Sequence, residues 1–180
     1  MDVRIEELIE ENLVRAPEWE THPYSCKYCI YWEHPELCTD PEIEVKEEML
    51  AKKRAWLRRV REEWGNCGKL LFLWDKAVGY AQYAPARFFP AAREYPAGPV
   101  SEDAVLITCL FISSVEHRRR GLGSTLLSAI LEELRGRGIA AVETFARRRT
   151  PPARWSSISS TASGCCGTTP SSPSCGGSSF

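Results

Sequence analysis

The stretch AVLITCLFISSVEHRRRGLGSTLLSAILEELRGRGIAAVETF, residues 104–145, decides the fold. It opens with a continuous apolar run over 104–112, as expected of a central strand that is buried on both faces. Residues 122–134 carry leucine and isoleucine at helical spacing, and two glycines then end the predicted helix. Residues 139–145 predict another strand. This order of strand, turn, helix and strand predicts an α/β sheet domain.

The turn between this strand and helix has the composition of an anion site. The first N–H groups of a helix have no partner inside the helix, and together with the helix dipole they attract negative charge. Arginines add forked donors that suit phosphate oxygens, and glycines let a ligand approach the backbone. Taken alone, such a turn also fits a solvated basic loop, but its place between a buried strand and an amphipathic helix favours a pyrophosphate-sized anion. The turn comprises Arg118, Arg119, Arg120, Gly121, Leu122, Gly123 and Ser124.

Residues 104–146 resemble the central motif of the GNAT N-acetyltransferase superfamily, which is a strand, then Arg/Gln-x-x-Gly-x-Gly/Ala, then a helix. The resemblance implies a mixed, mostly antiparallel sheet flanked by helices, and an acyltransferase that uses acetyl-CoA as its cosubstrate. It implies that the loop amides bind the pyrophosphate, with Arg118, Gly121 and Gly123 at the motif positions. The intervening amides would come from Arg119, Arg120, Leu122 and Ser124.

The resemblance also implies that the preceding strand faces the pantetheine arm and holds the thioester carbonyl, through Leu110, Phe111 and Ile112. We count one extra residue between this strand and Arg118, which would shift the strand contacts by one. Other phosphate-binding motifs fit less well. Gly-Lys-Ser/Thr is absent, so a nucleoside triphosphatase is not expected. A Rossmann site would need its glycine loop after an early strand, although Glu143 stands at the expected spacing.

The implied reaction is direct attack of an amine on the thioester, with backbone N–H groups polarising the carbonyl. The candidate bases are Glu116, His117 and Glu143, and none is singled out, so the catalytic residues stay unknown. The acceptor stays open among a small amine, a protein N-terminus and a lysine. A non-catalytic acyl-CoA-binding module is the alternative function, and a homodimer stays open as the assembly.

The N-terminal part predicts helices around a segment rich in cysteine and aromatic residues. The spacing of apolar residues predicts an amphipathic helix over 3–14 and a second helix over about 41–64. Residues 69–84 predict two strands joined at Asp75 and Lys76, and the proline-rich stretch 85–103 predicts a loop.

Cys26 and Cys29 form a Cys-x-x-Cys pair, with further ligand types nearby in sequence: His22, His34, Cys38 and Cys67. Such a pair is a common half of a zinc site, but no second pair stands at a standard spacing. A buried cluster of thiols and aromatic rings is the favoured interpretation, with zinc and redox chemistry as alternatives. In a GNAT fold the aromatic residues here would line the acceptor side of the sheet.

Composition limits the setting of the protein. The chain has 180 residues, a formal net charge of −1 and eight cysteines. No apolar run approaches the roughly 20 residues that cross a bilayer, and the acidic N-terminus has no signal-peptide core. We therefore expect a cytoplasmic protein with reduced thiols and no membrane partner, and the near-neutral charge gives no support to nucleic-acid binding.

The C-terminal residues break the pattern, since all charged residues lie at or before Arg154. The GNAT family continues with a helix bearing a Tyr and then a Gly-Phe pair, both missing here. Reading the codons from Arg154 to Gly164 in a shifted frame can restore that sequence, with the Tyr at the position of Ile158. The hypothesis is a domain over 1–149 without its final helix and strands, of doubtful activity, and a disordered, frameshifted tail over 150–180. Within the domain, residues 1–65 would precede an acetyl-CoA-binding core over 66–149.

Overall fold

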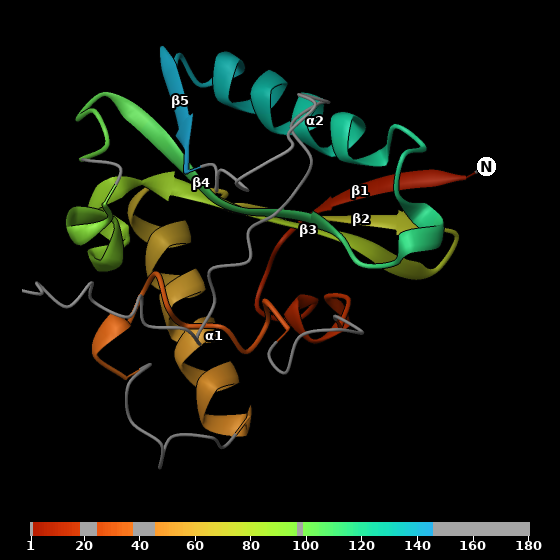
Figure 1. Cartoon of the computed structure of the whole chain (residues 1–180), viewed down its shortest axis with the longest axis horizontal. Helices are drawn as coiled ribbons and strands as arrows, with labels where there is room; N and C mark the ends of the chain where they lie inside the picture. Colours follow the sequence, from red (N-terminus) through yellow and green to blue (C-terminus); the bar gives the residue numbers. More distant parts are fainter. Residues whose placement is uncertain (1, 19–24, 38–45, 97–98, 146–180) are drawn as a thin grey trace, which may run out of the picture.

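The computed structural model describes residues 2–18, 25–37, 46–96 and 99–145. These residues form a five-stranded sheet in the order β1-β2-β3-β4-β5. Strands β1 to β4 pair antiparallel, and β5 pairs parallel to β4 (Figure 1). The predicted mixed, mostly antiparallel sheet is therefore confirmed. The strands are β1 (Val3–Glu7), β2 (Gly68–Leu73), β3 (Lys76–Pro85), β4 (Ala104–Ile112) and β5 (Ala141–Thr144).

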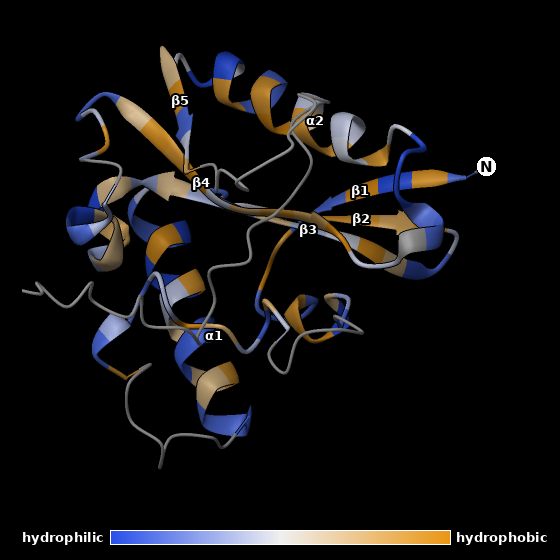
Figure 2. Ribbon diagram, viewed as in Figure 1, coloured by the Kyte–Doolittle hydropathy of each residue, from blue (hydrophilic) through white to orange (hydrophobic). Residues whose placement is uncertain are grey.

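Two helices cover opposite faces of this sheet, α1 (Lys46–Glu63) on one side and α2 (Leu122–Gly136) on the other (Figure 1). Each helix turns its apolar stripe to the sheet, so the core has two layers (Figure 2). Strand β4 supplies both layers: Leu106, Cys109 and Phe111 pack on the α1 side, and Val105, Ile107 and Ile112 pack on the α2 side. The prediction of a central strand buried on both faces is confirmed.

The prediction of a helix over residues 3–14 is wrong. Val3 and Ile5 alternate with polar residues and pack on the α2 side, while Leu8 is buried on the α1 side. The strand forms because the edge of β2 needs a partner for its backbone groups, and residues 3–7 supply one from Val3–Leu73 to Glu7–Lys69. A short 3-10 helix, Leu13–Arg15, follows.

Most other predicted elements are present with shifted ends. Helix α1 matches the described part of the prediction for 41–64, and β5 is shorter than the predicted 139–145. The hairpin turns at Trp74 and Asp75, one residue earlier than expected, and Trp74 takes a left-handed φ of 57°. The proline-rich loop contains two 3-10 helices, Ala86–Phe88 and Pro90–Glu94, and two more lie at Pro35–Leu37 and Val115–His117.

The predicted tail over 150–180, with its shifted frame and its missing strands, lies outside the described residues. Among the residues that are described, no helix has the length and apolar character to cross a membrane.

Candidate active site

The loop from β4 to α2 gives the helix an open N-terminus. Gly121 caps α2 with a φ of 80° and, having no side chain, leaves the first N–H groups of the helix without a capping bond from the cap residue. The first bond within the helix runs from the Thr125 N–H to the Gly121 carbonyl oxygen over 2.9 Å. The N–H groups of Leu122, Gly123 and Ser124 precede that bond, so they are the donors that a ligand can use. The predicted anion site thus has the backbone geometry that it needs.

The two glycines of the loop, Gly121 and Gly123, have different structural roles. Gly121 needs its freedom of φ, because L side chains rarely adopt 80°. Gly123 has an ordinary φ, and a Cβ there would meet only Ile112 Cγ1, at 4.0 Å. A side chain at 123 is therefore compatible with the fold and would occupy the space in front of the helix. That is the expected pattern for a glycine kept for ligand approach.

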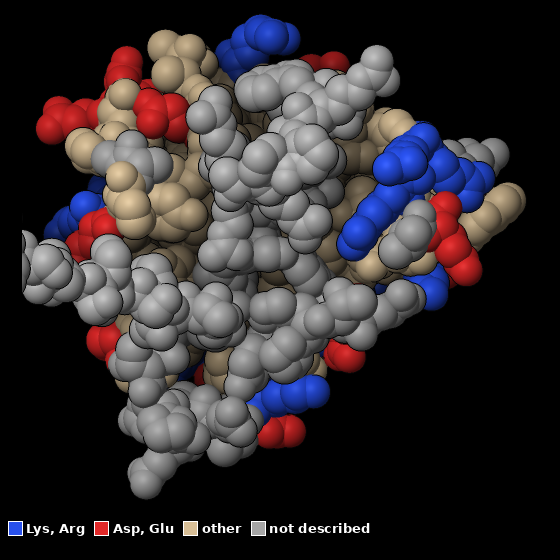
Figure 3. Space-filling model, viewed as in Figure 1, with Lys and Arg blue, Asp and Glu red and all other residues tan. Residues whose placement is uncertain are grey.

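The three arginines before the cap surround this N-terminus with positive charge. Arg118, Arg119 and Arg120 are all exposed, and Figure 3 shows Lys and Arg side chains gathered over the loop between β4 and α2. Arg119 takes a left-handed φ of 59°, so two of the three residues from 119 to 121 have a positive φ. Arg118 also donates from Nε to the Ile112 carbonyl oxygen over 3.4 Å, which ties the loop to the end of β4.

Strand β4 parts from β5 halfway along its length. The parallel ladder runs from Ala104–Ala141 to Ile107–Thr144, and no described pair continues it. At the same point the pairing with β3 steps from Tyr83–Ile107 to Gln82–Cys109, which leaves Thr108 as the extra residue of a β-bulge. A bulge bends and twists its strand, which accounts for the divergence. In Figure 1, β4 continues toward the loop before α2 while β5 stays at the other end of the sheet.

The predicted strand contacts lie on this diverging half of β4. Phe111 is buried on the α1 side and Ile112 on the α2 side, and Leu110 is half-buried. Two of the three side chains are therefore committed to the core, so the strand offers a ligand mainly its backbone edge. The same edge leads directly into the loop with Arg118, Gly121 and Gly123.

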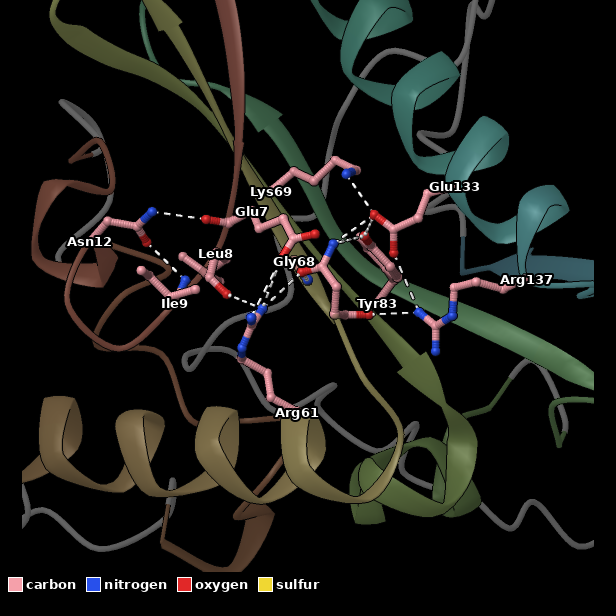
Figure 4. A network of polar contacts seen from close by, with 11 residues as sticks. Glu7, Leu8, Ile9, Asn12, Arg61, Gly68, Lys69, Tyr83, Glu133 and Arg137 are labelled. Carbon is pink, nitrogen blue, oxygen red and sulfur yellow. Dashed lines mark hydrogen bonds and ion pairs between the residues drawn. The ribbon is translucent and has the colours of Figure 1, made fainter.

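Helix α2 is held on the sheet by a polar network around Glu133 (Figure 4). The Glu133 carboxylate accepts bonds from Lys69 Nζ at 2.6 Å, Asn66 Nδ2 at 2.6 Å and the Tyr83 hydroxyl at 3.1 Å. Burial raises the pKa of Glu133, but these donors outweigh burial and leave the pKa below its ordinary value. Arg137 adds two backbone contacts, to the carbonyl oxygens of Asn66 and Trp64. The network fixes the end of α2 that lies away from the glycine loop.

The three candidate bases are not brought together. Glu116 is exposed, and its N–H donates to Ser114 Oγ over 3.2 Å. His117 is half-buried, and its Nδ1 has no partner among the described residues. Glu143 lies on β5, where it accepts a bond from the Ser101 N–H over 3.2 Å. This arrangement singles out none of them as a general base.

The four cysteines among the described residues lie in the core. Cys26, Cys29, Cys67 and Cys109 are buried and form no disulfide. A hydrogen bond to Cys109, together with burial, raises the pKa of Cys26, and burial raises the pKa of Cys67 to about 12. Within the described ranges no three His, Cys, Asp or Glu side chains are grouped to hold a metal ion, while His22 and Cys38 lie outside those ranges. The packing fits the favoured thiol and aromatic cluster.

Aromatic rings from three segments meet where β5 ends. The Phe145 ring stacks on Tyr95 at 4.2 Å between centroids and lies at 5.8 Å from Trp32, and Trp32 and Tyr95 are 5.5 Å apart. Tyr31 touches Trp32 edge-on at 5.2 Å. The aromatic part of the cysteine-rich segment thus lies on the α1 side at the point where β4 and β5 part.

A buried polar network beside these rings is absent from the sequence-based predictions. The Lys53 ammonium lies 2.6 Å from Glu33 Oε1 and 2.9 Å from Gln82 Oε1, and the Tyr80 hydroxyl donates to Gln82 Oε1 over 2.7 Å. Gln82 Nε2 also donates to Glu33 Oε1. Burial disfavours the Lys53 charge, but the Glu33 carboxylate outweighs it and raises the pKa of Lys53. The sequence does contain a signal for this network. Lys53 stands among the apolar residues of α1 that face the sheet, and a buried charge needs a partner.

Comparison with known proteins agrees with this architecture. The model of the acetyltransferase (GNAT) family matches residues 29–154, which is more than half of the chain. The aminoglycoside acetyltransferase AAC(6')-Iy, in complex with the bisubstrate analogue CoA-S-monomethyl-acetylneamine, has a TM-score of 0.51 at 13% identity, over 83% of each chain. The PaiA N-acetyltransferase of Thermoplasma acidophilum, in complex with coenzyme A, has a TM-score of 0.48 at 15% identity, over 83% of this chain and 82% of that one. No curated protein matches the chain in sequence.

The chain therefore belongs to the GNAT acetyltransferase family. The fold class and the acyltransferase class expected from residues 104–146 are both confirmed.

Proposed function

We propose that this chain binds acetyl-CoA between the diverging half of β4 and the N-terminus of α2, and transfers the acetyl group to an amine. One observation carries the proposal. The free N–H groups of Leu122, Gly123 and Ser124 lie at the end of a strand edge that β5 has left, over residues 108–112. A pyrophosphate at the helix and an extended arm along the strand fit these two features together.

Each part of the cosubstrate has a partner in this arrangement. The pyrophosphate accepts bonds from the helix N-terminus, and Arg119 and Arg120 supply charge around it. The pantetheine amides pair with the backbone of residues 110–112, as an added strand would. The thioester then lies near Thr108, where a backbone N–H polarises its carbonyl. The neutral amine attacks the carbonyl carbon, the C–S bond breaks, and the proton that the amine nitrogen loses passes to the departing thiolate, so that CoA leaves as the thiol.

Titration calorimetry with acetyl-CoA tests the binding half of the proposal. Replacing Gly123 with Val should weaken acetyl-CoA binding by 10-fold or more, because the isopropyl group fills the space in front of the helix amides. Gly136→Val is the matched control, since it lies at the other end of α2 and a Cβ there meets nothing within 4 Å. Equal acetyl-CoA affinity in the two variants, with both folded, would contradict the assignment.

Release of the CoA thiol in the presence of amines tests the catalytic half. The panel is spermidine, an aminoglycoside, a peptide with a free N-terminus and a peptide with a single free lysine. An amine-dependent rate above hydrolysis supports an acetyltransferase. Tight acetyl-CoA binding without turnover of any member supports the acyl-CoA-binding module instead. The four described cysteines, which form no disulfide, fit a reducing, cytoplasmic setting for either activity.

A further inference from the structure

We infer that Glu33 is a specificity-determining residue, and that its second carboxylate oxygen accepts a hydrogen bond from the amino group of the acceptor. This inference rests on the proposed function and adds to it a site for the amine. Glu33 has no exposed side-chain surface, and no described residue donates to its Oε2. A carboxylate oxygen that is buried without a donor is costly, so such an atom points to a missing partner.

The position of Glu33 brings it to the reaction centre. Gln82, which donates to Glu33 Oε1, pairs in register with Cys109 of β4. The Gln82 carbonyl oxygen accepts a bond from Thr108 Oγ1, the bulge residue, over 3.3 Å. Glu33 therefore lies one side chain away from the point where β4 leaves β5. It approaches that point from the α1 side, whereas α2 and its glycine loop lie on the other face (Figure 1).

Trp32, the residue before Glu33, lies on the β5 side of the point where β4 and β5 part. Trp32 stacks on Phe145, which follows the last paired residue of β5, Thr144. Trp32 thus contacts the residue that follows β5, and Glu33 is linked to β4 through Gln82 of β3. Tyr31 and Tyr95 both contact Trp32 and are half-buried, so their side of the molecule is the one from which an acceptor would approach Glu33.

The charges of the network leave Glu33 Oε2 available to bind the acceptor amine. Lys53 and Gln82 both bind Glu33 Oε1, so the ion pair balances the carboxylate without using Oε2. A buried ion pair is weak support for a fold, since an apolar pair of similar volume is often as stable. Its second oxygen selects groups that carry an N–H or O–H donor. A primary amine satisfies it with one hydrogen and directs its lone pair toward the thioester.

The decisive variant is the double substitution Glu33→Gln with Lys53→Met. The single E33Q change would leave the Lys53 charge buried and unpaired, and would destabilise the fold for that reason alone. The double variant removes both charges and puts an amide, which carries donors, where the carboxylate was. Glu36→Gln is the matched control, because it removes an exposed carboxylate three residues along the same segment.

We expect the double variant to melt as cooperatively as the parent and to bind acetyl-CoA with unchanged affinity. Its kcat/KM for the best amine of the panel should fall by about 10- to 100-fold, as expected for a lost hydrogen bond to a charged group. The loss should fall on the amine, with the KM for acetyl-CoA unchanged. E36Q should match the parent in every measurement.

Two results would overturn the inference. One is an unchanged kcat/KM for amines in the folded double variant, as expected if only water binds Oε2. The other is failure of every panel amine to bind the parent in calorimetry with CoA present. Failure of the proposed function itself is distinct, because the parent would then not bind acetyl-CoA at all.

Discussion

Gly121 and Arg119 both take left-handed backbone conformations, with φ of 80° and 59°, and together they shape the loop before α2. Glycine adopts this region without steric penalty, whereas other residues adopt it rarely. Arginine has no intrinsic preference for the left-handed region, so the surrounding loop imposes the conformation. Strain of this kind belongs to sites where the backbone itself presents groups to a ligand.

Gly121→Ala should cost about 1–2 kcal/mol of unfolding free energy, because a Cβ is strained at that φ although the space around it is open. Gly136→Ala on the same helix should instead stabilise by about 0.5–1 kcal/mol, since alanine loses less backbone entropy there. Urea denaturation of both variants measures the difference. Equal urea midpoints for the two variants would mean that the backbone at position 121 accommodates a Cβ without strain.

The buried thiols should resist alkylation while the protein is folded. The pKa of Cys67 is raised to about 12 by burial, so its thiolate is scarce at pH 8, and reagents cannot reach it. Mass mapping after iodoacetamide should find Cys26, Cys29, Cys67 and Cys109 unmodified in buffer and modified in urea. Rapid labelling of Cys26 and Cys29 in buffer would argue for the redox alternative.

At the scale of elements, α2 is held by packing along its length and by Glu133 near its C-terminal end. Leu126 and Ile130 are fully buried against the sheet, and Glu133 joins three donors from β2, β3 and the turn before them. These contacts fix the direction of the helix axis. The direction of the N–H groups at its other end is therefore set by residues at the opposite end of the helix.

The Glu133 network should make stability depend on pH. Because the folded pKa of Glu133 lies below its ordinary value of 4.5, the carboxylate contributes stability above that pH and loses it as the pH falls further. Glu133→Gln should lower the melting temperature at pH 7 and flatten its decline below about pH 4.5. Glu132→Gln, on the exposed face of the same helix, should leave the pH profile as it is. Parallel curves of melting temperature against pH for the parent and E133Q would contradict this prediction.

At the scale of the whole molecule, the outer edge of β5 bears on whether the protein associates with other chains. It is the last strand of the described sheet and has four residues, with no further strand beside it among the described residues. An unpaired edge favours association with other chains. The charge-free stretch after Arg154 has few large apolar side chains with which to cover such an edge.

Replacing residues from about Arg149 onward with the shifted-frame reading should raise the melting temperature, the soluble yield and the amine-dependent release of CoA. The reason is that additional strands would bury apolar area at roughly 25 cal/mol per Å². Expression of both chains and side-by-side melts and assays measure the effect. A chain as written that melts cooperatively and turns over equally fast would refute the shifted frame.

The sequence by itself determined the family, the central strand, the helix after it and the glycine-rich turn for which we propose anion binding. All of these come from residues 104–145, where hydrophobic period, glycines and arginines act locally and point to one structure. The predicted helix over 3–14 failed because its spacing of apolar residues also suits a short strand, and only pairing with β2 decides between them.

Tertiary structure alone decided the rest of the site. The bulge at Thr108 and the parting of β4 from β5 depend on pairing between strands that are distant in sequence. The network of Glu33, Lys53 and Gln82 joins the cysteine-rich segment, α1 and β3. None of the three residues belongs to a recognisable sequence motif. A buried charge is stable only beside its partner, so its role becomes visible when folding brings the partner to it.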